Sequence, residues 1–236
     1  MYTNVERLRQ SLLDKGVKTP FNIFDICSAL KTTKIKACPF TTKGLRGMAT
    51  IANDPSDINC ILVNSNLSFV EQNFHGIHEL IHIVSCPKNS GQTFSCFETV
   101  KPNQNSYIEW VANEGAAELL IPYRKLLPII KQKYPELIRD LGTYNFCEKY
   151  ADEFYVTSTV LQHRIDSLKY EIFQYINGTD IDSIQILSKK AQENRGIYIK
   201  SLVDLENERL SSWFSNFKAP VLTSHDSTML KKSQTT

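Results

Sequence analysis

The chain has 236 residues, enough for one large domain or two small ones. Hydrophobic residues make up 42% and charged residues 22%, as in ordinary soluble proteins, and the net charge of +2 gives no argument for nucleic-acid binding. No apolar run reaches the roughly 18 residues of a membrane-spanning helix. The N-terminus lacks the basic and then apolar order of a signal peptide. We therefore expect a cytoplasmic protein without a membrane partner.

The N-terminal part predicts two short helices followed by strands. Amphipathic spacing favours a helix over residues 4–15, and Pro20 begins a second one. Alternating residues predict three strands, at 34–38, 47–51 and 58–64. The predicted fold class is therefore α+β, with a small, mostly antiparallel three-stranded sheet whose edge could bind an extended peptide.

The next segment predicts a helix that carries a metal-binding motif. Its apolar residues recur at helical spacing, and Ser68 with Glu71 predicts a capping box at its start. His78, Glu79 and His82 form an H-E-x-x-H motif. Positions four apart share one helix face, so both histidines can bind one metal ion while Glu79 reaches a water molecule on it. The motif is typical of zinc hydrolases, with the glutamate as general base. The alternative is a core helix whose histidines only pack.

A catalytic zinc ion needs a third protein ligand, which must lie beyond His82. Ser85 and Lys88 stand where a metzincin has glycine and histidine, so that class is excluded. His75 lies one turn too early on the motif helix to complete a tetrahedron easily. Residues 87–105 are polar and irregular and predict a long loop, either a mobile segment that contacts substrate or a solvated surface loop.

Glutamates around the next predicted helix, at 106–121, are better candidates. The choices are Glu98, Glu109, Glu114 and Glu118. Glu98 lies in the loop. Small and apolar residues form a stripe along the helix through Ala112 and Ala116, and Glu114 and Glu118 point away from that stripe. Glu109 lies on this stripe. Asn113, one turn later on the same face, can hydrogen-bond a ligand histidine and fix its tautomer.

Six cysteines are scattered along the chain and form no C-x-x-C pair, so a second metal site built on cysteines is not expected. Without a signal peptide they are expected to be reduced thiols. Cys86 and Cys96 flank the motif segment, and the sequence gives neither of them a role.

The chain resembles the ImmA/IrrE family of zinc metallopeptidases in two linked motifs, Phe74-x-x-x-His78-Glu79-x-x-His82 and Glu109-x-x-Ala112-Asn113-x-x-Ala116-Ala117-Glu118-Leu119-Leu120-Ile121-Pro122. The resemblance extends from Phe21 to Leu168. It implies that His78, His82 and Glu109 bind zinc and that Glu79 is the catalytic base. The sequence departs from the family pattern at two positions. Gly115 replaces the usual aromatic residue of the glutamate helix, and Ile81 replaces the small residue common before the second histidine.

The remaining chain predicts helices over 136–141, 145–154 and 158–168, and one or two long helices over 182–217. The pair over 146–168 has the outline of a helix-turn-helix, although two packing helices without basic character explain it more simply. We expect residues 1–134 to form a metallopeptidase-like domain, 135–217 an all-helical C-terminal region and 218–236 a disordered tail.

The resemblance implies an intracellular zinc endopeptidase of a bacterium or phage. Several members act on a helix-turn-helix repressor, often encoded beside them, and so release a mobile element or a stress regulon. The expected cofactor is Zn²⁺, and Tyr107, Tyr123 and His75 are the candidates for a donor to the oxyanion. The alternative is a non-proteolytic regulator, an antirepressor or a DNA- or partner-binding protein that keeps the fold. The intact Glu79 favours catalysis.

Overall fold

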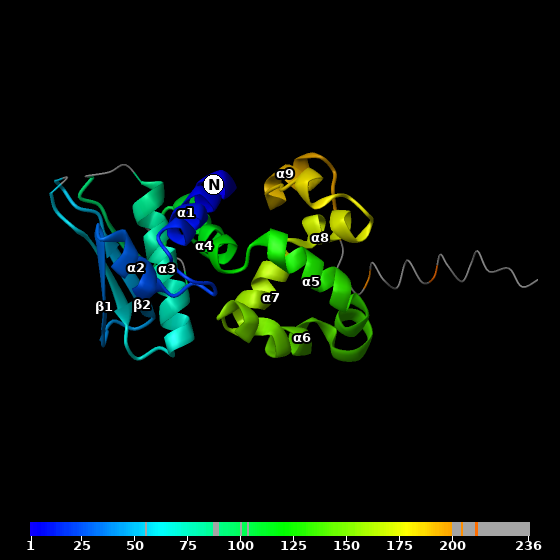
Figure 1. Cartoon of the computed structure of the whole chain (residues 1–236), viewed down its shortest axis with the longest axis horizontal. Coiled ribbons are helices and arrows are strands. Elements are labelled where there is room, and N and C mark those ends of the chain that lie inside the picture. The colour runs from blue at the N-terminus through cyan, green and yellow to red at the C-terminus, as the bar shows by residue number, and fades with distance from the viewer. Residues whose placement is uncertain are drawn as a thin grey trace, which may run out of the picture. The chain divides into compact units, whose positions relative to one another are not determined.

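The structure is a computed structural model that describes residues 1–199 apart from 55, 87–89, 100 and 103, together with Asp204 and Ser211. Of residues 139–142 it describes the backbone alone. Contacts group Met1–Ile199 into one compact unit (Figure 1). The tail expected over 218–236 lies outside the described residues, and the domain boundary expected at residue 134 stays a prediction.

A four-stranded mixed sheet forms one layer of the first unit. Its strands are β1 (Thr33–Cys38), β2 (Leu45–Thr50), β3 (Asn59–Asn64) and β4 (Thr93–Phe97), in the spatial order β1-β3-β2-β4. The β1–β3 pair is parallel, whereas β2 pairs antiparallel with both β3 and β4. The α+β class is thus confirmed, and the three expected strands are present, but the sheet has a fourth strand and its β1–β3 pair is parallel.

The fourth strand comes from the segment that was expected to be a loop. Residues 93–97 alternate in the sequence, but the polar and irregular residues around them hide the signal. Pairing with β2 stabilises β4, with an irregular register between Leu45 and Gly47. Such a tertiary contact cannot be read from local propensity.

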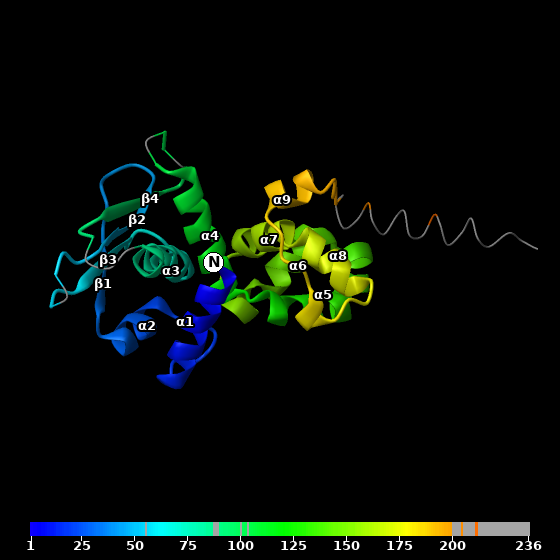
Figure 2. The ribbon, with the colours of Figure 1, turned by 90° about the horizontal axis from the view of Figure 1, so that it is seen from above.

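Helix α3 (Phe69–Ser85) packs against the sheet and carries the motif histidines. Figure 2 shows it end-on beside the strands. The capping box is confirmed, since Ser68 Oγ accepts from the Glu71 amide at 3.3 Å and Glu71 Oε2 accepts from the Ser68 amide at 3.0 Å. The capping box fixes where the helix begins, and so it fixes which residues of the following turns face the sheet.

Three further helices complete this part of the chain: α1 (Tyr2–Asp14), α2 (Ile23–Leu30) and α4 (Ser106–Leu120). Helix α4 lies closely against α3. At Gly115 the two helices are so near that an added Cβ would stand 2.9 Å from Cγ2 of Ile81. The two departures from the family pattern therefore meet each other. The larger side chain at 81 occupies the space that a side chain at 115 would need.

The chain from residue 123 to 199 is helical but broken into short elements. They are α5 (Tyr123–Pro135), η1 (Glu136–Leu141), α6 (Gly142–Tyr150), η2 (Ala151–Phe154), α7 (Ser158–Ser167), α8 (Lys169–Ile176), η3 (Ile181–Ser183) and α9 (Lys189–Asn194). The expectation of one or two long helices from residue 182 is wrong up to residue 199, because α9, the α-helix in this stretch, spans only six residues. The rest of that expected helix lies almost wholly outside the described residues.

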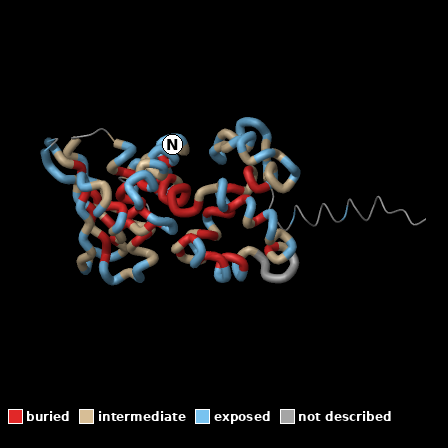
Figure 3. The backbone as a smooth tube through the Cα atoms, viewed as in Figure 1, coloured by how far each residue is buried: buried red, intermediate tan, exposed pale blue. Residues whose placement is uncertain are grey.

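Buried residues run through α3 and α4 and along the inner sides of α5, α6 and α7 (Figure 3). Three titratable side chains of α3 are among them, which is unusual because burying such groups costs free energy unless they are paired or bind a ligand. Among the described helices, none combines the length and apolar character that crossing a membrane requires.

Candidate metal centre

Three side chains from two helices bring their donor atoms together. Nε2 of His78 lies 3.1 Å from Nε2 of His82, on successive turns of α3. From α4, Glu109 places Oε2 3.3 Å from Nε2 of His78 and Oε1 3.6 Å from Nε2 of His82. Donors about 2.1 Å from a tetrahedral zinc ion stand about 3.4 Å apart. Two imidazole nitrogens and one carboxylate oxygen at these spacings fit a catalytic zinc ion with an open fourth position.

Neighbouring side chains fix the orientation of these donors. Nδ1 of His78 donates to Oδ1 of Asn113 at 2.9 Å, so the lone pair of this imidazole is on Nε2, facing the other donors. The His82 ring stacks on Phe94 of β4, with ring centroids 4.4 Å apart. Nε2 of Gln104 donates to Oε1 of Glu109 at 3.1 Å and also to the Ser95 carbonyl at 2.7 Å.

The protonation states suit a metal ion. Burial lowers the pKa of His78, so its imidazole is neutral near pH 7. Partial burial raises the pKa of Glu109, but its contacts with His78 and His82 outweigh this effect, and the pKa falls to about 2. A neutral imidazole and an ionised carboxylate are the forms that bind a metal.

Glu79 lies on the same turn as His78 and is completely buried. Neither of its carboxylate oxygens has a hydrogen-bond partner. Burial raises its pKa to about 8, with a further contribution from the charge of Glu109, while the nearby backbone amide of Cys96, which does not reach hydrogen-bond geometry, opposes the shift. A buried carboxyl without partners is costly, and a base with a pKa near the working pH is what proton transfer requires.

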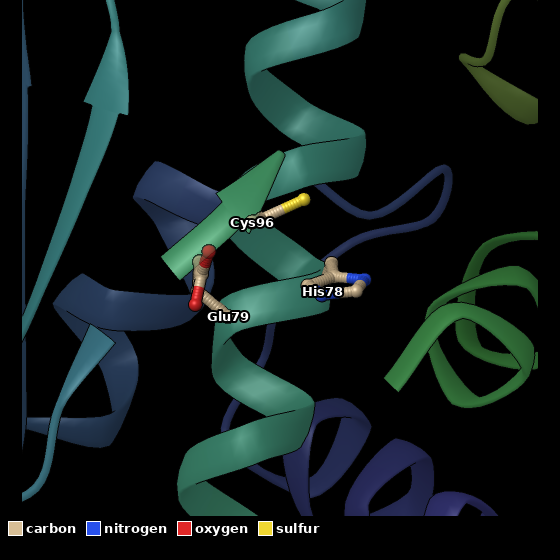
Figure 4. A group of neighbouring side chains, drawn as sticks. All are labelled: His78, Glu79 and Cys96. Carbon is tan, nitrogen blue, oxygen red and sulfur yellow. The ribbon is translucent and has the colours of Figure 1, made fainter. Parts of the chain in front are cut away.

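The sheet leaves room for this carboxyl group. An added Cβ at Gly47 of β2 would stand 2.9 Å from Oε1 and 3.1 Å from Cγ of Glu79. Figure 4 shows Cys96 coming from β4 and lying over the turn of α3 that carries His78 and Glu79. The base is therefore enclosed between α3, β2 and β4.

The three candidates for an oxyanion donor lie in different places. His75 packs against Phe74, and its Nδ1 is 3.5 Å from Sγ of Cys96. Tyr107 is 69% exposed and stacks with Trp110 on α4. Tyr123 packs edge-on against Tyr2. The choice among these three stays a prediction.

Four residues at this centre had no role in the sequence-based reasoning. They are Gly47, Phe94, Cys96 and Gln104. Two of them lie on β4, so recognising the alternation over 93–97 as a strand would have placed them near the motif helix. Gly47 and Gln104 act through tertiary contacts, for which the sequence carries no local signal.

Glu114 and Glu118 belong to a separate buried cluster. Arg164 of α7 is buried and pairs with both carboxylates, and its Nε donates to the Ile121 carbonyl at 3.2 Å. Tyr2 of α1 donates to Oε1 of Glu114 at 2.7 Å. Glu118 thus pairs with Arg164 instead of joining the three donors of the metal centre, and it is buried. This cluster ties α4 to α1 and α7.

Comparison with known families agrees with this geometry. Residues 30–166 match the model of a peptidase family described as the IrrE N-terminal-like domain. The matched stretch is more than half of the chain and contains α3, α4 and the whole sheet. No curated protein matches the chain. With the family model and both motifs in agreement, the chain belongs to the ImmA/IrrE family of metallopeptidases.

Proposed function

We propose that this protein is a zinc-dependent endopeptidase. His78, His82 and Glu109 would hold the ion, and Glu79 would act as the general base. The convergence of three donors beside a buried carboxyl without partners carries the proposal. A structural zinc site would need four protein ligands and no such carboxyl.

When bound, zinc supplies Lewis-acid polarisation of a peptide carbonyl and acidifies a water molecule. Glu79 takes the proton of the attacking water and passes it to the leaving amine. Asn113 and Gln104 hold His78 and Glu109 in place through the hydrogen bonds described above. Enclosure of Glu79 between α3 and the sheet keeps its carboxyl basic enough to accept the proton.

The substrate would bind as an extended chain along β4. This strand is last in the sheet order, so its outer edge has no strand partner among the described residues. It also lies against the centre, because Phe94 contacts His82 and Cys96 lies near Glu79. Main-chain pairing at such an edge binds peptides with little sequence preference.

We propose a helix-turn-helix repressor of a phage, mobile element or stress regulon as the substrate, cleaved in the cytoplasm. Family membership supports this choice. The alternative, a regulator that binds DNA or a partner without cleavage, finds less support. The single arginine of α7, Arg164, is buried, and the exposed residues of that helix are Thr159, His163, Asp166 and Ser167. Such a surface has little attraction for DNA phosphates.

Cleavage of a purified helix-turn-helix repressor from the same genome tests the proposal. The zinc-loaded wild type is compared with Glu79→Gln and with Glu148→Gln, a change on the exposed side of α6. We expect cleavage by the wild type and by Glu148→Gln, and a rate at least about 100-fold lower for Glu79→Gln. Release of the repressor from its operator that survives Glu79→Gln would contradict catalysis and favour the regulator.

A further inference from the structure

A second group of metal-binding side chains overlaps the first. His78, Glu79 and Cys96 are buried, and one donor atom from each lies within 4.8 Å of the other two. The two groups share His78 alone, and Cys96 is not grouped with His82 or Glu109. Figure 4 shows how Cys96 of β4 approaches the two residues of α3. The second group offers one nitrogen, one oxygen and one sulfur as donor atoms, whereas the first group offers two nitrogens and one oxygen.

The donors of this second group are available. Both oxygens of Glu79 are buried and have no hydrogen-bond partner. Sγ of Cys96 has a weak contact, at 3.5 Å, with Nδ1 of His75. Burial raises the pKa of the Cys96 thiol, so a metal ion that binds this sulfur must displace the thiol proton to solvent.

One ion excludes the other. With Nδ1 of His78 held by Asn113, we assign Nε2 as the nitrogen that would bind a metal in either group. A single imidazole nitrogen cannot serve two ions at once. An ion therefore resides either with His82 and Glu109 or with Glu79 and Cys96.

We propose that His78, Glu79 and Cys96 form an alternative metal position that selects thiophilic divalent ions, for which cadmium is the probe. Thiolate favours soft ions, whereas two imidazoles and a carboxylate suit zinc. Cadmium prefers thiolate more strongly than zinc does, so the sulfur of Cys96 is the donor that distinguishes this position from the first group. Occupation of this position uses the carboxylate of Glu79.

The consequence for activity rests on the proposed function. With Glu79 bound to an ion, its carboxylate cannot accept the proton of water, so a soft ion would silence the peptidase. The binding itself does not depend on whether the chain is a peptidase.

Titration of the metal-free full chain with cadmium chloride tests the position. The group His78, His82 and Glu109 contains no sulfur, so a sulfur-to-cadmium absorption band at the centre reports Cys96. We expect the absorbance that corresponds to one bound cadmium ion per chain to be lost in Cys96→Ser and in Cys96→Ala. The same absorbance should be kept in Cys86→Ser. Using both Cys96 variants guards against the failure of one of them to fold. Subtracting each variant's absorbance from that of the wild type removes any signal from cadmium bound to the exposed Cys60.

Two more variants distinguish the alternative position from a shared ion. His82→Ala should keep the cadmium band, and Glu79→Gln should weaken cadmium binding by at least about tenfold. A band unchanged in both Cys96 variants would overturn the proposal. Loss of the band in His82→Ala would overturn it too, because sulfur would then join the first group. The absorbance requires no peptidase assay, so failure of the proposed function leaves this result readable.

Discussion

The buried Arg164 cluster allows a sharp prediction about stability. Arg164→Met removes a guanidinium that is completely buried between two carboxylates. Glu114 and Glu118 have side chains that are 13% and 5% exposed, so neither can be fully solvated after the change. The Ile121 carbonyl also loses its donor. Methionine has a similar length, so the change acts mainly through charge and hydrogen bonding.

Breaking one side of a buried ion pair costs about 3–5 kcal/mol, because the remaining charge is buried without a partner. We therefore expect Arg164→Met to lower the free energy of unfolding by about 4 kcal/mol. Adding Glu118→Gln should recover part of this loss, since one of the two unpaired charges is then absent.

The assay is urea unfolding of the metal-free chain followed by circular dichroism. Arg124→Met is the matched control. Arg124 pairs with Asp182 at the surface, where the two side chains are 49% and 75% exposed, and such pairs contribute at most about 1 kcal/mol. Equal losses for Arg164→Met and Arg124→Met would refute the reasoning, as would a double mutant less stable than Arg164→Met alone.

Three further predictions concern single side chains. Asn113→Ala should weaken zinc binding about 10–100-fold in a chelator competition, because His78 loses the acceptor that fixes its tautomer; an unchanged affinity would contradict this. Gly47→Ala should cost about 1–3 kcal/mol in urea unfolding by crowding Glu79, and an equal cost in a Glu79→Ala background would argue against the contact. Burial raises the pKa of Glu171 from 4.5 to about 7, so the stability it contributes is complete below pH 4.5 and is lost as the pH rises through 7. Glu171→Gln should then equal the wild type near pH 4 and exceed it near pH 8 by up to about 3 kcal/mol, whereas a pH-independent difference would count against a shifted pKa.

Local signals in the sequence predict α3 well. The pairing of Ser68 with Glu71 marks its start, and apolar spacing gives its buried face. Helix α4 also follows from periodicity, and its small residues correctly indicate a close approach to α3. The H-E-x-x-H spacing and the position of Glu109 are properties of helical geometry, which is why their convergence could be anticipated.

Other features depend on contacts between distant segments. Strand β4 forms because β2 offers it a partner, and β1 pairs with β3, a strand that does not follow it directly in the chain. The burial of Glu118 depends on Arg164, which follows it by 46 residues. Cys96 has no role in the sequence and gains one through the position of β4. Local patterns do not carry such pairings.

The central claim is that His78, His82 and Glu109 hold a zinc ion beside Glu79. Anomalous diffraction at the zinc absorption edge from crystals of the zinc-loaded chain tests it most directly. We expect one strong peak about 2.0–2.2 Å from Nε2 of both histidines and from a Glu109 oxygen, with no protein atom in the fourth position. A peak at Cys96 and Glu79 instead, or no peak at this centre, would contradict the claim.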